Sequence, residues 1–358
     1  MLSGYRGGAM TALNRPHLGK LLALPAALLA SVLLVSLTAC THGGDQAPSS
    51  SPTPSGAAVV DINSQPRSVI ADGGEFRLPV SDFGSQWNPL HADVSSDTKL
   101  ITSTLLPQLF TDDDTGNPTP NPDYLAAVNA TGDNPQVVTY TLNPSATWAN
   151  GRAIDAGDFI ADWKACDGQN VSFKCADTKG YAQVASVKKG STPQQVIVTY
   201  RSSYDDWPST FNTLLPAGSV KDPDTFNNGW TSLDDIKDWL SGPFTVADDD
   251  TKHGLLTEKP NPDWWGDQPK LAQLTFRAYD PKDQLAALQA NKIDAVDLTQ
   301  DSSQASKVSD IPNCEVREAA VSDSSRQVVA TRTSVANYGA FGKSSPVWAD
   351  VGYLPPNA

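Results

Sequence analysis

The chain has 358 residues, which is enough for two domains or for one large bilobal unit. Hydrophobic residues make up 39% of the chain and nine residues are Trp, so a packed globular body is expected and wholesale disorder is excluded. The 40 acidic residues outnumber the 26 basic ones and give a formal net charge of −14, which argues against nucleic acid as a partner.

The first 39 residues differ in character from the rest of the chain. Three basic residues precede an almost wholly apolar run of nineteen residues, Leu21 to Ala39. A basic region, an apolar region and small residues at a cleavage point are typical of an export signal, so residues 1–39 are predicted to be one. The alternative is a transmembrane anchor, because a run of this length is nearly enough to span a bilayer.

The signal ends in Leu37-Thr38-Ala39-Cys40, which resembles the lipobox of bacterial lipoproteins. The resemblance implies that Cys40 is acylated and becomes the N-terminus after cleavage. Residues 41–57 are rich in Gly, Ser and Pro and nearly free of apolar side chains, so they are predicted to be a flexible tether. The body that follows is therefore expected outside the cytoplasm, held at the cell membrane by an N-terminal lipid.

Three segments have the pattern of strands. Residues 75–80 follow a Gly pair and read as an early strand, and residues 137–142 and 196–200 alternate apolar and polar side chains. The second and third segments are predicted to belong to one antiparallel sheet.

Three other segments have helix-starting signals. Asp155 is the expected N-cap of a helix over residues 156–165, with Asp158 in the capping-box position. Ser232 is expected to open a helix through residue 240, and Asp280 one from residue 281, followed by a strand over residues 293–298. Strands that alternate with helices predict a mixed α/β protein.

Catalytic and metal-binding motifs are missing from the sequence. It contains no nucleophile elbow, no phosphate-binding Gly-rich loop and no zinc-protease helix, and His91 and His253 are expected in surface loops. The acidic runs at residues 112–114 and 248–250 lack the spacing of a calcium loop and read as solvated turns. We therefore expect neither an enzyme nor a bound metal or cofactor.

Cys166 and Cys175 lie nine positions apart around a polar loop. In an exported chain this arrangement favours a local disulfide, with two reduced, buried thiols as the alternative. If Cys40 is acylated, Cys314 is left without a partner.

Two blocks of sequence share an order of turns, strands and helix starts that covers roughly residues 70–317. The first block consists of Leu105–Phe110, Tyr124–Ala126, Tyr140–Leu142 and Ala146–Phe159, and the second of Ser241–Phe244, Lys259–Trp265, Pro269–Leu271 and Gln284–Asp294. Together these blocks resemble the extracytoplasmic solute-binding proteins of peptide-type ABC importers, the dipeptide and oligopeptide-binding family 5. Asn291 departs from the usual Gly of the family, although Asn tolerates the same left-handed geometry.

The resemblance implies a bilobal periplasmic-binding-protein-like fold of type II, with mixed sheets, that closes on a peptide and delivers it to a membrane permease. It places the loop after the first strand at the cleft, so the expected ligand-facing residues are Ser85, Gln86, Trp87 and Asn88. Phe244 and Trp265 are expected to be structural.

Beyond Arg317 the pattern departs from that of the family. Residues 318–358 show no period-two or helical pattern of any length, so they are predicted to be an atypical, loosely ordered tail. The expectation is a truncated member, with residues 58–317 as the solute-binding domain and the second lobe largely missing.

Two functions remain open at this point. The first is a lipid-anchored, monomeric solute-binding component of an ABC importer that binds di- or oligopeptides. The second is an exported hydrolase, or a non-transport interaction protein built on one surviving lobe.

Overall fold

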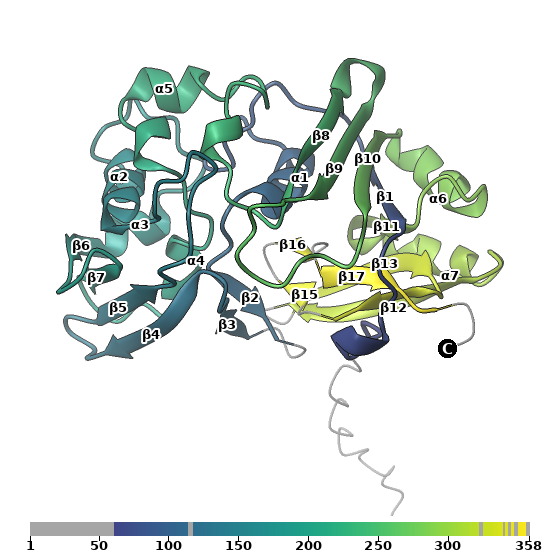
Figure 1. Cartoon of the computed structure of the whole chain (residues 1–358), viewed down its shortest axis with the longest axis horizontal. Coiled ribbons are helices and arrows are strands. Elements are labelled where there is room, and N and C mark those ends of the chain that lie inside the picture. The colour runs from purple at the N-terminus through teal and green to yellow at the C-terminus, as the bar shows by residue number, and fades with distance from the viewer. Residues whose placement is uncertain are drawn as a thin grey trace, which may run out of the picture. The chain divides into compact units, whose positions relative to one another are not determined.

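The computed structural model describes residues 61–113, 117–321, 325–338, 341–342, 345–346 and 350–355. The predicted export signal, Cys40 and the tether lie outside these residues. The described residues form several sheets with helices packed against them, which confirms a mixed α/β protein (Figure 1).

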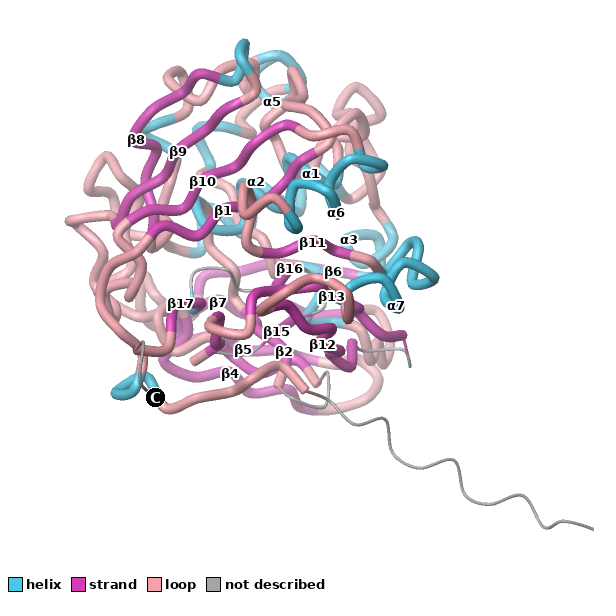
Figure 2. Tube along the Cα trace, turned by 90° about the vertical axis from the view of Figure 1, so that its right-hand side faces the viewer, coloured by secondary structure: helices cyan, strands magenta, loops and turns pink. Residues whose placement is uncertain are grey.

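A four-stranded sheet has the first long strand, β1, at one edge. Its order is β1-β10-β9-β8, with β1 parallel to β10 and the other pairs antiparallel, and the strands lie side by side in Figure 2. The strand predicted over residues 75–80 is confirmed, and alternate residues of it are buried. The bounds are β1 Glu75–Val80, β8 Phe244–Asp250, β9 Leu255–Pro260 and β10 Gln273–Ala278.

A second four-stranded sheet, at the left of Figure 1, is wholly antiparallel. Its order is β4-β5-β7-β6, so the two alternating segments of the sequence are direct neighbours, as expected. Helix α2 (Ala156–Cys166) packs against β6 and β7, and the short α3 (Lys179–Gln183) packs beside it. The strands are β4 Leu125–Thr131, β5 Val137–Leu142, β6 Val184–Lys189 and β7 Gln195–Tyr200.

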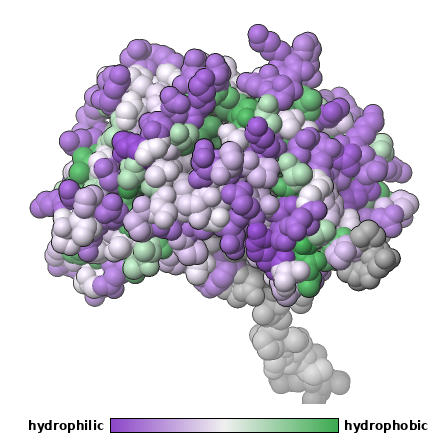
Figure 3. Space-filling model, viewed as in Figure 1, coloured by the Kyte–Doolittle hydropathy of each residue, from purple (hydrophilic) through white to green (hydrophobic). Residues whose placement is uncertain are grey.

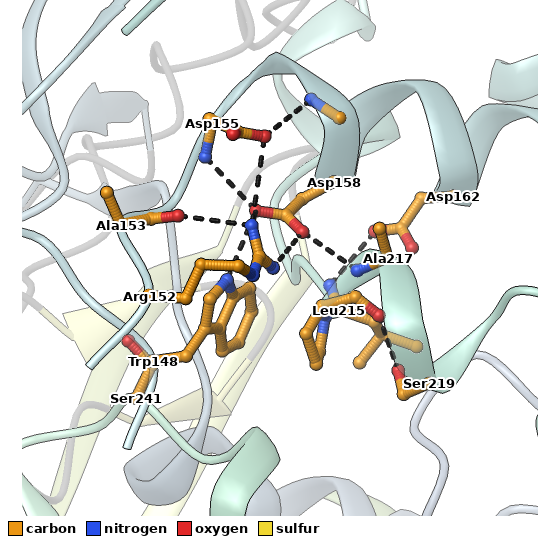
Figure 4. A network of polar contacts seen from close by, with 12 residues as sticks. Trp148, Arg152, Ala153, Asp155, Asp158, Asp162, Leu215, Ala217, Ser219 and Ser241 are labelled. Carbon is orange, nitrogen blue, oxygen red and sulfur yellow. Dashed lines mark hydrogen bonds and ion pairs between the residues drawn. The ribbon is translucent and has the colours of Figure 1, made fainter. Parts of the chain in front are cut away.

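The start of α2 is fixed by a buried carboxylate that joins three segments (Figure 4). Asp158 completes the predicted capping box by accepting from the N–H of Asp155 at 3.1 Å. It also accepts from Trp148 Nε1 at 3.1 Å, from the Arg152 guanidinium and from the Ala217 N–H at 2.8 Å. A turn before the helix and a distant loop are thereby both held to its first turn.

A third sheet corrects the prediction for the tail. Strand β13 (Ser325–Arg332) lies between β11 (Ala295–Asp297) and β12 (Cys314–Val321) and pairs antiparallel with both. Strands β14 (Val335–Asn337) and β17 (Val351–Tyr353) pair further along. The prediction of a loosely ordered tail is wrong for these residues, because Val329 and Ala330 are buried on opposite faces of β13 and leave no alternating pattern to read.

The remaining elements are short, apart from α1 and α6. The predicted helix over residues 232–240 is wrong, because only Lys237–Trp239 forms a 3₁₀ turn there while Leu233, Ile236 and Leu240 are buried. The helices are α1 Ser96–Leu105, α4 Trp207–Thr210, α5 Pro223–Asn228, α6 Pro281–Gln289 and α7 Ala305–Val308, with 3₁₀ turns at Arg67–Val69, Ala217–Ser219, Thr251–His253 and Thr299–Gln304. The short strands are β2 Phe110–Asp112, β3 Pro118–Pro120, β15 Phe341–Gly342 and β16 Ser345–Pro346.

Helix α6 begins and ends as the sequence predicts. The Asp280 side chain accepts from the Lys282 N–H, and Asn291 just past the end has φ 57°, the left-handed geometry that Asn tolerates. Arg77 of β1 then binds the Asn291 carbonyl at 2.8 Å and both carboxylate oxygens of Asp294. This clamp fixes the segment after α6 against the first sheet.

The surface drawn in Figure 3 is mostly hydrophilic, with hydrophobic residues in small groups. No helix among the described residues is long and apolar enough to cross a membrane.

Candidate functional site

A cavity of about 710 Å³ lies between α1, β2, α3 and α4. This volume is within the range of sites that bind small molecules. Its lining includes Leu90, Lys99, Thr102, Ser103, Phe110, Asp177, Lys179, Tyr181, Tyr204 and Asp206.

Helix α1 supplies one wall of this cavity. Its first turn is fixed by Ser95, whose Oγ accepts from the Thr98 N–H at 3.0 Å. Thr102 and Ser103 donate their hydroxyls to carbonyls of the preceding turn, at 2.8 and 2.7 Å, so their oxygens can still accept from a solute. Lys99, on the same side of the helix, is exposed and brings a positive charge to this wall.

A disulfide between Cys166 and Cys175 fixes the start of the segment that leads into α3, which forms another wall of the cavity. Their Cα atoms are 5.6 Å apart, and Cys166 is the last residue of α2. On the far side of the bond, the Ala92 N–H donates to the Lys174 carbonyl at 2.7 Å and the Ala176 N–H donates to the Leu90 carbonyl at 2.8 Å. The chain that continues through Asp177 into α3 therefore starts from a fixed point.

Aromatic rings held by packing form much of the remaining lining. Phe110 lies edge-on to Trp207, with ring centroids 5.5 Å apart, and Tyr181 lies edge-on to Phe211 at 5.2 Å. Tyr204 is stacked on Tyr200 at 5.7 Å. The cavity thus has rigid apolar and aromatic surfaces between its polar walls.

A buried polar group lies behind this aromatic lining. Asp162 of α2 accepts from the Leu215 N–H at 2.9 Å through Oδ2, and burial raises the pKa of its carboxyl well above the usual value. Burial, then Asp162, Tyr200 and Asp177, raise the pKa of Tyr181. Among the described residues neither Asp162 Oδ1 nor the Tyr181 hydroxyl has a hydrogen-bond partner.

The residues expected to face a ligand lie beside this cavity rather than in its lining. Gln86, Trp87 and Asn88 are buried, Trp87 packs in the hydrophobic core, and the side chains of Gln86 and Asn88 bind the chain itself. Gln86 Nε2 donates to the Asn227 carbonyl at 2.9 Å, and Asn88 Nδ2 donates to the Phe226 carbonyl at 3.0 Å. Ser85 is exposed. The ligand contact expected of these four residues stays a prediction, and three of them have a structural role as well.

The lining residues near α3 and α4 were not found from the sequence. Tyr181 lies in the short helix α3, and Tyr204 and Asp206 lie in the segment just before α4, so no periodic pattern marks them, and only the packing of segments distant in the chain brings them together. The one local signal was the Cys pair, which marks the loop that leads into this wall.

The two histidines expected in surface loops differ in their burial. His253 is exposed, as expected, whereas His91 is buried and its Nδ1 accepts from the Asp93 N–H at 3.0 Å. The surface prediction for His91 is wrong because residues 90–92 pair with the disulfide loop and are covered by it. No cluster of three or more His, Cys, Asp or Glu side chains among the described residues is arranged to hold a metal ion.

The model for the middle part of the bacterial extracellular solute-binding proteins, family 5, matches residues 119–350. The chain belongs to this family. The match runs past Arg317 into β13, so the departure from the family pattern read there in the sequence is also corrected.

Similar proteins support the same assignment. The oligopeptide-binding protein OppA of Mycobacterium tuberculosis is 34% identical over 271 residues, which are 74% of this chain and 45% of that protein. Among solved structures, the periplasmic EDTA-binding protein EppA has a TM-score of 0.64 at 24% identity, covering 74% of this chain and 50% of that one. Haemophilus influenzae OppA in complex with RPPGFSPFR has a TM-score of 0.57 at 18% identity, covering 69% and 50%.

These likenesses show the periplasmic-binding-protein-like fold of type II. The chain spans about half the length of the curated relatives that it matches.

Proposed function

We propose that this protein is a lipid-anchored, extracytoplasmic solute-binding component of an ABC importer and that it binds peptides for transport. The observation that carries the proposal is a cavity of about 710 Å³ with polar walls and a rigid aromatic lining in a chain of family 5. The name of the OppA relative supports peptides as the solute class.

The proposal also covers the partners of the protein, its oligomeric state and its location. The partners are a peptide, the permease subunits of the importer and the membrane itself, reached through an acyl chain, such as palmitate, on Cys40. The protein acts as a monomer, without a cofactor and without catalysis. The Cys166–Cys175 disulfide suits an extracytoplasmic location. Ser85, together with the buried Gln86, Trp87 and Asn88, borders the bound solute.

Peptide binding is tested by calorimetry on the full chain with RPPGFSPFR, the peptide bound by the Haemophilus relative, and with shorter peptides. We expect saturable binding, and a ligand present at a hundred times its Kd should add about 2.7 kcal/mol to the free energy of unfolding. Peptides of two to nine residues that neither bind nor stabilise the chain would exclude this function.

The anchor is tested separately by expressing the chain with its own leader in a bacterium that exports lipoproteins. Labelled palmitate should enter the wild type and the Cys314→Ser control, whereas Cys40→Ser should remain unlabelled. Equal labelling of Cys40→Ser would contradict the lipobox interpretation.

A further inference from the structure

A buried histidine lies where three segments beside the cavity meet. His91 is only 2% exposed, and it pairs with Cys175 across an antiparallel bridge. Its ring lies against that of Phe226 of α5, with the ring centroids 6.0 Å apart. A titratable side chain is thus enclosed between its own segment, the end of the disulfide loop and α5.

The hydrogen bonding of His91 fixes the protonation state of its ring. Nδ1 accepts from the Asp93 N–H at 3.0 Å, and a backbone amide can only donate, so Nδ1 carries no proton. The ring is therefore neutral with its proton on Nε2, which has no hydrogen-bond partner among the described residues. A protonated ring would turn Nδ1 into a donor facing the Asp93 N–H and would bury an unpaired charge. The folded arrangement accommodates only the neutral ring.

The charges that face the ring act in opposite directions. The Asp93 carboxylate has Oδ2 3.8 Å from Nδ1 and favours the charged ring, but its side chain is 74% exposed. Lys174, from the disulfide loop, acts against the charged ring. The carboxylates of α5, Asp222 and Asp224, are not among the charges that shift the pKa of His91. Burial is the largest effect, and it lowers the pKa of the ring below the usual 6.5.

The residues on either side of His91 are bonded to the segment that leads into α3. The Ala92 N–H donates to the Lys174 carbonyl at 2.7 Å, and the Ala176 N–H donates to the Leu90 carbonyl at 2.8 Å. Leu90 and Ala176 both line the cavity. A change in the hydrogen bonding of His91 therefore reaches the cavity wall through two backbone hydrogen bonds.

We propose that His91 and the pairing of residues 90–92 with residues 174–176 form an acid-sensitive latch of the cavity wall. The neutral ring keeps the latch closed, and the protonated ring opens it and loosens the segment that leads into α3. On the basis of the function proposed above, the consequence is that the chain binds its peptide at neutral pH and binds it more weakly when its surroundings become acidic.

Proton binding favours the open latch in acid. An exposed histidine takes up a proton near pH 6.5, whereas His91 in the closed latch does so only at a lower pH. Between these two values opening binds a proton, so the closed form is fully favoured above pH 6.5 and loses stability as the pH falls. For a single proton this shifts the equilibrium between the closed and open forms by at most about 10-fold per pH unit.

The test measures amide hydrogen exchange in the full chain at pH 7.5 and pH 5.0, corrected for the intrinsic pH dependence of exchange. In the wild type, the protection of residues 90–93 and of residues 174–183, which include α3, should fall by at least about 5-fold at pH 5.0.

The matched variant is His91→Asn. The Asn Oδ1 takes the position of Nδ1 and can accept from the Asp93 N–H, but Asn does not titrate in this range. The loss of the ring should lower protection equally at both pH values, so the fall in acid should disappear. His253→Asn, at a position with 82% side-chain exposure, is the control and should follow the wild type. Because the other titrating groups are shared, the difference between the wild type and His91→Asn isolates His91.

A second measurement needs no variant. The ring nitrogen resonances of His91 in the wild type should show a proton on Nε2 and none on Nδ1 at pH 7.5. Protonation of the ring at lower pH should coincide with the loss of protection. A charged ring, or a proton on Nδ1, at pH 7.5 would overturn the latch.

Peptide affinity gives a separate readout. Calorimetry with RPPGFSPFR should show that the affinity of the wild type falls by at least about 5-fold from pH 7.5 to pH 5.0, whereas that of His91→Asn does not.

The outcomes distinguish this proposal from the function on which its consequence rests. If the protection of the wild type changed with pH no more than that of His91→Asn, the latch would be overturned, whether or not the peptide binds. A fall in protection without a fall in affinity would overturn the link between the latch and the solute. A fall in protection in a chain that binds no peptide at either pH would support the latch and count against the peptide function.

Discussion

Glu258 lies in an environment very different from that of an ordinary surface carboxylate. It lies on β9, fully buried beneath α1, and its Oε2 accepts from the Thr104 hydroxyl at 2.7 Å. Oε1 has no partner among the described residues. Burial raises the pKa of this carboxyl to about 8, with the Thr104 hydrogen bond acting in the opposite direction. The neutral acid is therefore the form that the fold accommodates.

A pH dependence of stability follows from Glu258. In the unfolded chain its carboxyl ionises near pH 4.5, whereas in the folded chain it stays protonated up to about pH 8. Between these values unfolding releases a proton, so this group lowers the free energy of unfolding by up to about 1.4 kcal/mol per pH unit as the pH rises. Above pH 8 both states are ionised and the effect levels off.

The measurement compares Glu258→Gln, which mimics the neutral acid, with the wild type by chemical unfolding at pH 5, 6, 7 and 8. The gain in stability from the substitution should grow steadily over this range. Asp248→Asn on the adjacent strand β8, an exposed position, serves as control and should follow the wild type. A difference between Glu258→Gln and the wild type that is constant with pH would exclude a buried neutral acid.

At the residue scale, the sequence predicted local geometry better than it predicted partners. Asp155 and Asp158 were expected as cap and capping box because that motif lies within four consecutive residues. That Asp158 also holds the Ala217 N–H was not foreseeable, because the loop that provides it lies 59 residues away. Likewise, the bonds from the Gln86 and Asn88 side chains to carbonyls of α5 were not foreseeable, and the ligand contact expected of these residues stays a prediction.

At the element scale, the strands and helices that carry their own signal were predicted almost to the residue. Strand β5 alternates because one face is buried, and α6 has a cap at one end and a left-handed Asn at the other. The segment at residues 232–240 has similar capping residues, but its apolar side chains are buried by a loop with a single 3₁₀ turn. Tertiary packing there overrides a helix signal that is only two turns long.

The disulfide acts between elements, because it ties the end of α2 to the segment that pairs with residues 90–92. Reduction, or Cys166→Ser with Cys175→Ser, should lower the free energy of unfolding by about 2–3 kcal/mol, since the closed loop is short. The measurement is thermal unfolding with and without a reductant. The wild type should respond to the reductant, and the double variant should not.

A matched control for that experiment is Cys314→Ser, which removes the free thiol on β12 and should respond to reductant as the wild type does. If the double variant were as stable as the oxidised wild type, the bond would contribute nothing to the fold. The orientation of the cavity wall would then depend on the backbone pairing alone.

At the scale of the whole molecule, β13 connects two hydrophobic clusters. Val329 packs in the large cluster that includes Phe76 and Leu274 of the first sheet, whereas Ala330 packs with Leu288 and Val296 in a separate smaller one. A strand covered on both faces has consecutive apolar residues rather than an alternating pattern. This is why the sequence alone gave no strand there, and why a segment interpreted as a tail is central to its sheet.

The integration of β13 into the fold is tested by placing a charge at its most buried position. Ala330→Asp puts a carboxylate into the smaller cluster, whose members are apolar, and should destabilise the chain by about 3 kcal/mol or more. Thr333→Asp, three residues on in an exposed turn, should change stability by less than about 0.5 kcal/mol. Chemical unfolding of both variants gives the comparison.

Equal stability of the two variants would show that β13 is not part of the cooperative unit. Protease resistance that ended near Arg317 in the wild type would lead to the same conclusion. A large loss for Ala330→Asp alone makes β11, β12 and β13 one folding unit, because the smaller cluster draws side chains from α6, α7 and all three strands.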